Sequence, residues 1–219
     1  MASKQRPEGG RPARRPVPFV RPVEMPMGRL PEWIIADTHW GHHNIIKYSR
    51  RPEDHDALMI ARWKEAIEPS DIVLHLGDVY FKNPELVMAA DLPGQIWFLR
   101  GNHDRDGAVN ALRAIGWRLA PPFHYQMGKW RIVFTHWPQE ALEANTINVH
   151  GHTHTLPERG ARWLSLSVER WDYRPQPLEA LLRGRIAILD DPERRQEHER
   201  VRSADWEAAQ QARSPRLEL

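Results

Sequence analysis

The sequence predicts an α/β fold, and three observations support this prediction. Short apolar runs rich in Ile, Val, Leu, Trp and Phe alternate with segments of helical periodicity, as in folds that place helices against a sheet. Several of the apolar runs end in polar loops that contain Gly, Asp, Asn or His. With 219 residues, 41% of them apolar, the chain can bury one substantial core. We therefore expect one folded domain at residues 31–188, with an extension at each end.

Strands and helices alternate in the first half of the chain. The apolar runs have the length of buried strands, and the segments between them show the spacing of amphipathic helices. Arg51-Pro52 interrupts the chain ahead of the first predicted helix. The predicted elements are, in order, a strand at 33–36, a helix at 54–67, a strand at 71–76, a helix at 84–90 and a strand at 95–99.

The second half of the chain has a pattern that indicates a more antiparallel arrangement. Gly128-Lys129 separates two apolar runs, residues 123–127 and 130–135, that are typical of a β-hairpin. Further strands are expected at residues 146–149 and 162–168.

The C-terminal segment differs in composition from the rest. From about Asp190 the chain is rich in Glu, Arg, Gln and Ala, and Asp191-Pro192 is typical of the start of a helix. We expect residues 189–219 to form an exposed charged helix or a tail.

The basic character of the chain is concentrated at its N-terminus. The whole sequence has a net charge of +2, but residues 1–30 carry seven basic and two acidic side chains, which is +5, so the remaining residues carry −3. A segment this rich in Arg and Pro buries little apolar surface, and we expect residues 1–30 to be a disordered tail. The charge of the remaining residues does not favour nucleic acid as a partner, although the basic tail leaves that partner open.

Cysteine is absent from the sequence, which excludes disulfide bridges and thiolate metal sites. Any bound metal must therefore use His, Asp, Glu, Asn or Gln. Arg and Pro interrupt the basic N-terminus and no long apolar run follows it, so the sequence predicts neither a signal peptide nor a membrane span. We expect a cytoplasmic protein with no membrane partner.

Side chains with catalytic chemistry gather where the predicted strands end. Loops at the carboxyl ends of strands in an α/β sheet converge on one crevice, so residues far apart in the sequence can meet there. Glycines in such loops allow sharp turns close to the site. The loops are Asp37-Thr38-His39, Gly77-Asp78, Gly101-Asn102-His103-Asp104, His136 and Gly151-His152-Thr153-His154.

This set of side chains suits a pair of divalent cations. Two cations about 3.5–4 Å apart repel each other, and a carboxylate between them offsets that repulsion. Neutral imidazole and carbonyl ligands then leave positions for water and substrate. Asp78 is our candidate for the bridging carboxylate. A single His-x-His is common without a metal, but motifs at five successive strand ends are difficult to explain by coincidence.

The order of these motifs resembles the calcineurin-like metallophosphoesterase superfamily. The resemblance extends over about residues 33–183. Two stretches, residues 40–46 with Arg50-Arg51-Pro52 and residues 168–175, resemble a small bacterial and phage branch of that superfamily. The resemblance implies a four-layer αββα sandwich with two metal ions at the sheet edge, and hydrolysis of a phosphate ester by a hydroxide that bridges the metals.

The resemblance also implies a set of ligands in which Asp78 is shared by both metals. The first metal also takes Asp37, His39 and His154, and the second also takes Asn102, His136 and His152. We expect Mn²⁺ at both positions, with Fe²⁺ or Zn²⁺ as alternatives, because the ligands mix imidazole, carboxylate and carboxamide groups.

His103 is not a ligand in this comparison. In the family it lies beside the substrate phosphate, where it stabilises charge or protonates the leaving oxygen. Asp104 hydrogen-bonds to it, which fixes its tautomer and raises its basicity.

Residues close to the motifs are candidates for contact with the substrate. His42 and Asn44 follow His39 closely enough to reach a phosphate oxygen or to support a ligand, and the alternative for Asn44 is to cap a loop. Trp40 and Trp137 adjoin ligands and are candidates for stacking on an aromatic group, with burial in the core as the alternative.

Arginines near the motifs are candidates for holding a phosphate, since a guanidinium matches the geometry of phosphate oxygens. Arg50, Arg51 and Arg100 are the residues concerned. The alternative for at least two of them is a solvated surface.

We therefore expect a dinuclear, metal-dependent phosphoric ester hydrolase that acts on a small phosphate ester. A nucleotide-like phosphodiester is the favoured substrate, because no arginine lies inside a ligand motif to serve a monoester dianion. The alternatives are a phosphomonoesterase served by arginines from distant segments, such as Arg170, and a nuclease recruited by the basic tail. A non-catalytic scaffold is disfavoured because every ligand position and His103 are present.

Overall fold

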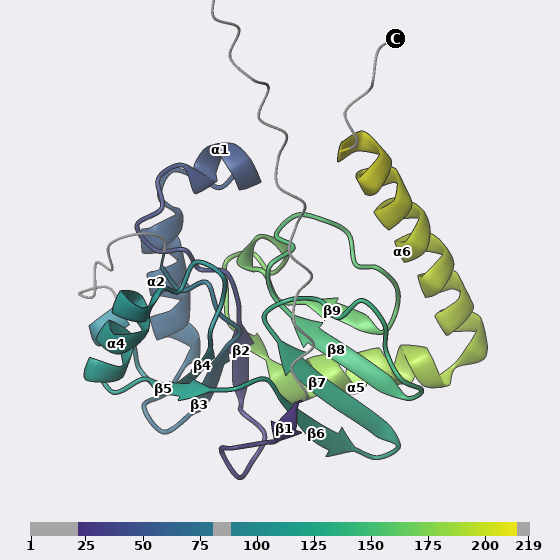
Figure 1. The fold of residues 1–219 in the computed structure, drawn as a ribbon, viewed down its shortest axis with the longest axis horizontal. Coiled ribbons are helices and arrows are strands. Elements are labelled where there is room, and N and C mark those ends of the chain that lie inside the picture. Colours follow the sequence, from purple (N-terminus) through teal and green to yellow (C-terminus); the bar gives the residue numbers. More distant parts are fainter. Residues whose placement is uncertain (1–21, 81–88, 214–219) are drawn as a thin grey trace, which may run out of the picture.

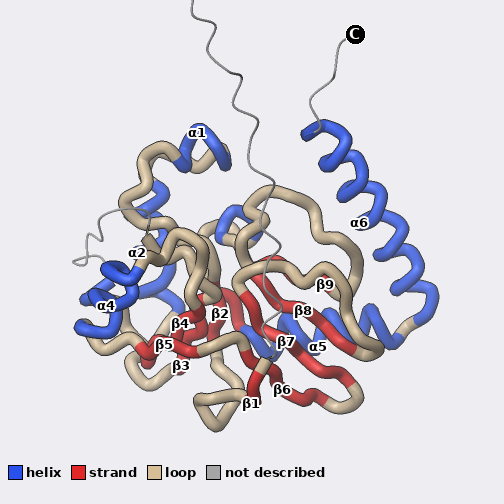
Figure 2. Tube along the Cα trace, viewed as in Figure 1, coloured by secondary structure: helices blue, strands red, loops and turns tan. Residues whose placement is uncertain are grey.

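Two five-stranded sheets form the centre of the protein (Figures 1 and 2). The computed structural model describes residues 22–80 and 89–213. The strands of the first sheet, in spatial order, are β10 (Gln176–Pro177), β2 (Trp33–Ile35), β3 (Ile72–His75), β4 (Gln95–Leu99) and β5 (Arg118–Ala120). Those of the second sheet are β1 (Val23–Glu24), β6 (Phe123–Met127), β7 (Trp130–Thr135), β8 (Thr146–His150) and β9 (Trp163–Ser165).

Helices lie on either side of the pair of sheets (Figure 1). On one side are α2 (His55–Ala66) and α4 (Asp106–Ala114), and on the other are α5 (Leu178–Asp190) and α6 (Pro192–Arg213), while the short α1 (Ile45–Ser49) precedes α2. The α/β fold with two sheets between helices, expected from the sequence and the resemblance, is confirmed.

The first sheet follows the sequence prediction closely. Strands β2 to β5 are all parallel, and only the edge strand β10 runs antiparallel to its neighbour β2. Helix α2 connects β2 to β3, and α4 connects β4 to β5, as parallel neighbours require. The strands expected at 33–36, 71–76 and 95–99 and the helix expected at 54–67 are confirmed. The helix expected at 84–90 lies largely outside the described residues.

The second sheet differs from the antiparallel arrangement that the sequence indicated. Only the hairpin of β6 and β7 is antiparallel, whereas β7 pairs in parallel with β8, and β8 with β9. The connections after β7 and β8 are long enough to return the chain to the start of the next strand, which periodicity alone does not reveal. The consequence is functional, because the carboxyl ends of β7 and β8 lie at the same edge of the sheet.

Two clusters of buried side chains hold these layers together. One cluster includes Trp63 of α2, Phe98 of β4 and Leu112 of α4, and fills the space between the first sheet and its helices. The other includes Phe134 of β7 and Leu182 of α5, together with apolar side chains of both sheets. The first sheet is therefore packed on both faces, so its strand ends are fixed points for the loops that follow them.

Part of the expected N-terminal tail belongs to the folded domain. Strand β1 pairs in parallel with β6, and Met25, Met27 and Leu30 pack against the core. These apolar side chains give the segment enough buried surface to be ordered, which the composition of residues 1–30 as a whole obscured. Residues 1–21 lie outside the described part of the chain.

The C-terminal segment forms a helix, one of the two expected alternatives. Helix α6 is attached to the loop that precedes β9 at several points. The carboxylate of Glu199 accepts a hydrogen bond from the backbone N–H of Ala161 at 3.1 Å, and the guanidinium of Arg159 lies 5.1 Å from the ring centre of Trp206. The helix thus braces a loop that begins at the Gly-His-x-His motif.

Two glycines allow the loops after β3 and β4 to touch backbone to backbone. Gly77 has a φ of +99°, and a Cβ on it would lie 2.6 Å from the backbone N of Gly101. A Cβ on Gly101 would lie 2.1 Å from Oδ1 of Asp78. Since real Cβ atoms do not approach so closely, only glycine fits at either position.

Replacement of Gly101 by Ala should therefore destabilise the protein. Overpacking of this kind costs about 1–3 kcal/mol. Gly107→Ala is the matched control, because Gly107 lies in α4 with nothing within 4 Å of an added Cβ. Thermal unfolding should show a lower midpoint for Gly101→Ala and an unchanged or higher midpoint for Gly107→Ala. Equal midpoints for the two variants would contradict the close packing of these loops.

Candidate metal centre

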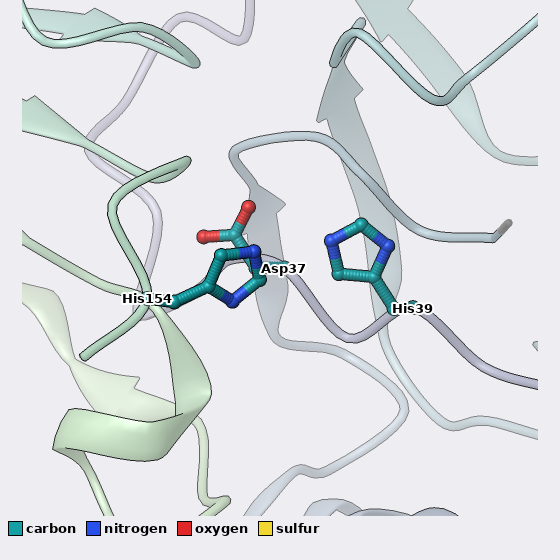
Figure 3. A group of neighbouring side chains, drawn as sticks. All are labelled: Asp37, His39 and His154. Carbon is teal, nitrogen blue, oxygen red and sulfur yellow. The ribbon is translucent and has the colours of Figure 1, made fainter. Parts of the chain in front are cut away.

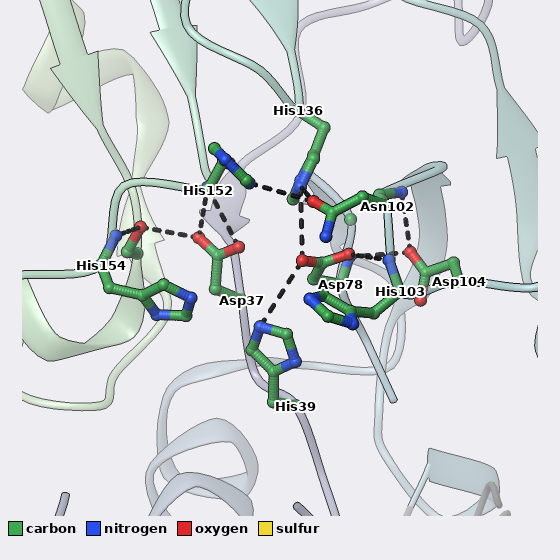
Figure 4. Close-up of polar contacts among 12 residues, drawn as sticks. Asp37, His39, Asp78, Asn102, His103, Asp104, His136, His152 and His154 are labelled. Carbon is green, nitrogen blue, oxygen red and sulfur yellow. Dashed lines mark hydrogen bonds and ion pairs between the residues drawn. The ribbon is translucent and has the colours of Figure 1, made fainter. Parts of the chain in front are cut away.

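The loops that follow β2, β3, β4, β7 and β8 converge at one edge of the two sheets (Figure 4). The backbone N–H of Asp37 donates to the carbonyl of Gly77, and that of His39 donates to the carbonyl of Asp78. The N–H of Gly151 donates to the carbonyl of His136, which ties the loops of the second sheet together in the same way. The structure thus brings all seven candidate ligands into one place.

The first group of candidate ligands consists of Asp37, His39 and His154 (Figure 3). One ligand atom from each lies within 4.8 Å of the others. Asp37 and His39 are buried, and His154 is half-buried. The group offers one carboxylate and two imidazoles as candidate ligands for one cation.

The second group consists of Asp78, His136 and His152, whose ligand atoms also lie within 4.8 Å of one another. Asn102 completes it, because its Oδ1 is 2.9 Å from Nε2 of His136 and 3.0 Å from Nδ1 of His152 (Figure 4). The second group therefore matches the set that the resemblance implied for the second metal, and the first group contains the residues implied for the first metal other than Asp78.

Asp78 lies between the two groups. Its Oδ2 is 3.5 Å from Nε2 of His39 and 3.4 Å from Nε2 of His136 (Figure 4). Its Oδ1 accepts a hydrogen bond from the backbone N–H of His103 at 2.8 Å. Burial opposes ionisation of this carboxyl, but the hydrogen bond and charge of His136 hold the pKa of Asp78 below its usual value. The carboxylate therefore lies close to candidate ligands of both groups.

Left-handed backbone conformations concentrate at these residues. Among the described residues, nine other than glycine have a positive φ, and five of the nine are candidate ligands. Such conformations cost free energy and persist where the surrounding structure enforces them, most often at functional sites. The five are Asp37, His39, Asp78, His152 and His154, with φ between 49° and 70°.

The donor atoms fit divalent cations. Within the described residues, neither ring nitrogen of the buried His39 makes a hydrogen bond, which leaves a lone pair for coordination. Burial lowers the pKa of His39, and it lowers the pKa of His152 to about 3, so both rings are neutral as ligands must be. Burial also disfavours charge on His136, yet its hydrogen bond with Asp78 raises its pKa to about 9, so a cation bound there would displace a proton.

His103 and Asp104 lie beside the two groups. The ring of His103 is 5.2 Å from that of His39, measured between ring centres. The carboxylate of Asp104 accepts hydrogen bonds from the backbone N–H groups of Asp78 at 2.7 Å, Val79 at 2.9 Å and Gly101 at 2.8 Å. Asp104 thus has a role that the sequence did not indicate, since it joins the loop after β3 to the loop after β4.

His42 and Asn44 occupy different surroundings. His42 is buried, and its ring centre lies 5.8 Å from that of His39. Burial lowers the pKa of His42 to about 4, so the ring is neutral near neutral pH. Asn44 is exposed at the start of α1, and its side chain makes no capping hydrogen bond there.

Two of the three arginine candidates, Arg51 and Arg100, are engaged by the protein itself. The guanidinium of Arg51 is fully buried and donates to the carbonyls of Asp37 and Thr38, both at 2.6 Å, so its assignment to a phosphate was wrong. Arg100 donates to the carbonyl of Asp104 at 2.8 Å and pairs with the exposed Asp106 at 2.7 Å. Arg50 is exposed, with a left-handed backbone conformation at the end of α1.

The two tryptophan candidates have different surroundings. Trp40 is 1% exposed and packs among Trp63, Tyr80 and Trp117, so it belongs to the core and cannot stack on a substrate. Trp137 is half-buried, and its ring centre is 3.7 Å from that of His152. Only Trp137 stands beside the candidate ligands.

Two residues that contact candidate ligands were not identified by the sequence analysis. The hydroxyl of Ser167 donates to Oδ2 of Asp37 at 2.6 Å, and Oε1 of Glu169 lies 2.9 Å from Nδ1 of His154. Ser and Glu here have no motif of their own. The resemblance of residues 168–175 to one branch of the superfamily was the signal that marked this segment.

Comparison with known proteins finds similar sequences and folds. The chain is 29% identical over 170 residues to an uncharacterized protein of Methanocaldococcus jannaschii, MJ1445, covering 69% of this chain and 89% of that protein. A protein of unknown function from Aquifex aeolicus, AQ665, has a similar fold, with a TM-score of 0.57 and 22% identity over 69% of this chain and 97% of that one. An archaeal phosphodiesterase matches with a TM-score of 0.37 and 20% identity, covering 62% and 81% of the two chains.

Across the helices that the structure describes, none has the length and apolar character needed to cross a membrane.

The family model of the calcineurin-like phosphoesterases matches residues 30–210, which include both groups of candidate ligands. The chain therefore belongs to the calcineurin-like phosphoesterase family and is a metal-dependent phosphoric ester hydrolase.

Proposed function

We propose that the enzyme is a phosphodiesterase that acts on small, nucleotide-like esters. The observation that carries this proposal is the engagement of the nearby arginines. Arg51 and Arg100 donate to backbone carbonyls of the site loops, and Arg170 donates to the carbonyl of Leu156 at 3.0 Å. A monoester dianion is best served by several free guanidinium groups, whereas a diester carries one charge less and has a second organic group to accommodate.

The remaining surroundings also support a diester. His42 is neutral near neutral pH, and Trp137 is partly exposed beside His152. A neutral imidazole and an indole contribute no positive charge, but they offer surface for an organic substituent such as a base or a ribose. Arg50 is exposed and makes neither of the backbone contacts that hold Arg51 and Arg100, so it is our candidate contact for an outer phosphate oxygen.

We propose two Mn²⁺ ions as the cofactor, with Fe²⁺ or Zn²⁺ as alternatives, since the donors are imidazoles, carboxylates and one carboxamide. Asp37, His39 and His154 would hold the first ion and Asn102, His136 and His152 the second, with Asp78 shared. When bound, such a pair of cations polarises a phosphoryl group and lowers the pKa of water.

The protein's own groups then have distinct tasks. Asp78 would supply negative charge to both cations, and Asp104 keeps the backbone of that loop in register with the loop that carries Asn102. His103, whose ring lies near that of His39, would donate a proton to the departing oxygen of the ester. His42 and Asn44 are the candidates for contact with the substrate beyond the reacting phosphate.

Replacement of Asp78 by Asn should abolish binding of the metal pair and activity together. An amide has the shape of the carboxylate but cannot supply its negative charge between two cations. Metal analysis after dialysis should find fewer than two Mn²⁺ per chain. Asp91→Asn, at an exposed position away from the site, is the matched control and should keep both. A fully loaded, active Asp78→Asn enzyme would disprove the assignment of Asp78.

Replacement of His103 by Ala should leave the metals in place and lower the rate by roughly 10²–10⁴, the contribution typical of a general acid. An ester with an activated aryl leaving group should lose less than an alkyl ester, because its oxygen departs without protonation. The measurement is kcat for the two esters, with His43→Ala, an exposed neighbour of His42, as the control. Equal losses for both esters would show that His103 acts on phosphate charge instead.

Diesters should be hydrolysed in preference to monoesters. With saturating Mn²⁺, kcat/KM is compared for a bis-aryl and a mono-aryl phosphate with the same leaving group, and then for 2′,3′-cyclic, 3′,5′-cyclic and open mononucleotides. We expect the higher value for the diester in each comparison. A tenfold advantage for monoesters, equivalent to about 1.4 kcal/mol of transition-state binding, would overturn the diesterase proposal.

A further inference from the structure

A buried ion pair joins two segments that are 118 residues apart in the sequence. The side chain of Arg51 is 0% exposed and that of Glu169 is 2% exposed. Oε1 of Glu169 accepts hydrogen bonds from Nη2 of Arg51 at 2.7 Å and from Nε at 2.9 Å. Arg51 lies in the loop between α1 and α2, and Glu169 lies in a short 3₁₀ helix, Val168–Arg170.

Both members of this pair contact residues of the first group of candidate ligands. Glu169 Oε1 is 2.9 Å from Nδ1 of His154. The guanidinium of Arg51 donates to the carbonyl oxygens of Asp37 and Thr38, each at 2.6 Å. One connected set of hydrogen bonds therefore reaches the ligand imidazole on one side and the ligand loop after β2 on the other.

This pair requires an explanation other than stability. Burying two charges is costly, and an apolar pair of the same volume is often as stable or more so. The pair does, however, contact both the imidazole of His154 and the loop that carries Asp37 and His39. A carboxylate beside Nδ1 of His154 accepts a hydrogen bond from the N–H at that nitrogen, which fixes the tautomer in which the lone pair of Nε2 is free for a cation. The guanidinium holds the carbonyls of a loop whose Asp37 and His39 have strained, left-handed conformations.

The contacts are confined to one of the two groups. Within residues 22–80 and 89–213, neither Arg51 nor Glu169 hydrogen-bonds or pairs with Asp78, Asn102, His136 or His152. A change at Glu169 should therefore act on one metal and not on the other.

We propose that Glu169 is a positioning residue for the first metal, which orients His154 directly and orients Asp37 and His39 through Arg51. The inference rests on the proposed assignment of these three residues as ligands. Arg51 belongs to the first of the two stretches that resemble one branch of the superfamily, and Glu169 belongs to the second, residues 168–175. The ion pair therefore assigns a function to both stretches.

The test is a titration of the metal-free protein with Mn²⁺, followed by calorimetry and by metal analysis at limiting free Mn²⁺. Glu169→Gln preserves the volume of the side chain and an acceptor for His154 but removes the charge that pairs with Arg51. The dissociation constant of one site should rise roughly 10–100-fold, the usual effect of losing a partner of a metal ligand, and the other site should be unchanged. At limiting Mn²⁺ the variant should hold one metal per chain where the wild type holds two.

The chain offers a matched control in Glu158. Its side chain is also 2% exposed and is paired with a buried arginine, Arg185, at 3.1 Å, but it contacts no candidate ligand among the described residues. Glu158→Gln should bind both metals as the wild type does, whatever its effect on thermal stability. Equal weakening of metal binding in both Glu→Gln variants would overturn the proposal, because loss of any buried ion pair would then suffice.

Further variants identify the affected site and cover a failure of Glu169→Gln to fold. Glu169→Asp keeps the charge but withdraws the oxygen from His154, and it should weaken the same site. In a His39→Ala background, which already impairs the first metal, Glu169→Gln should weaken metal binding no further. Wild-type affinity at both sites in Glu169→Gln or Glu169→Asp would overturn the proposal. Failure of the wild type to bind two metals would instead overturn the proposed function.

Discussion

The arrangement of the site depends on a single carboxylate, that of Asp78, which lies between the two groups of candidate ligands. Asp78 occupies this position because its backbone is held between the loops that carry the other candidate ligands. Gly77 and Gly101 make that approach sterically possible, and Asp104 fixes it by accepting three backbone hydrogen bonds. The remaining ligands are distributed around this fixed point, three on each side.

Topology explains how residues so far apart reach that point. Strands β2, β3 and β4 of the first sheet are parallel, so Asp37, Asp78 and Asn102 leave it at the same edge. In the second sheet the parallel pairing of β7 and β8 does the same for His136 and His152. The bridge between Ala36 and Ser167 connects the two sheets beside Asp37, so their carboxyl edges form one continuous rim.

The sequence was sufficient for the parts of the protein that depend on local chemistry. The ends of the strands before Asp37, Asp78 and Asn102 could be predicted, because the sequence shows where an apolar run gives way to a polar loop. The parallel pairing of β7 with β8 could not be predicted, since hydrophobic alternation fixes the faces of a strand but not its partner. The family model and the two groups of side chains agree with the ligand pattern that the motifs indicated.

The sequence did not reveal which of the side chains near the motifs are buried. Arg51 and Trp40 adjoin the motifs and have side chains suited to phosphate and base, yet both are enclosed by the protein. Glu169 was overlooked for the converse reason, because a glutamate 15 residues beyond His154 gains meaning only when the chain folds back. Pro-rich composition likewise concealed the apolar Met25, Met27 and Leu30 next to β1.

Because the candidate ligands are spread along the chain, their order in the sequence also determines when the site can assemble during synthesis. Asp37 and Asp78 leave the ribosome early, but neither group of ligands is complete before His152 and His154 have emerged, and the contact of Glu169 with Arg51 must wait longer still. Contacts of such long sequence separation form late in folding. A nascent chain that has completed only β2 to β5 therefore lacks the imidazoles of His136, His152 and His154, and the full set of candidate ligands can assemble only after most of the chain has been made.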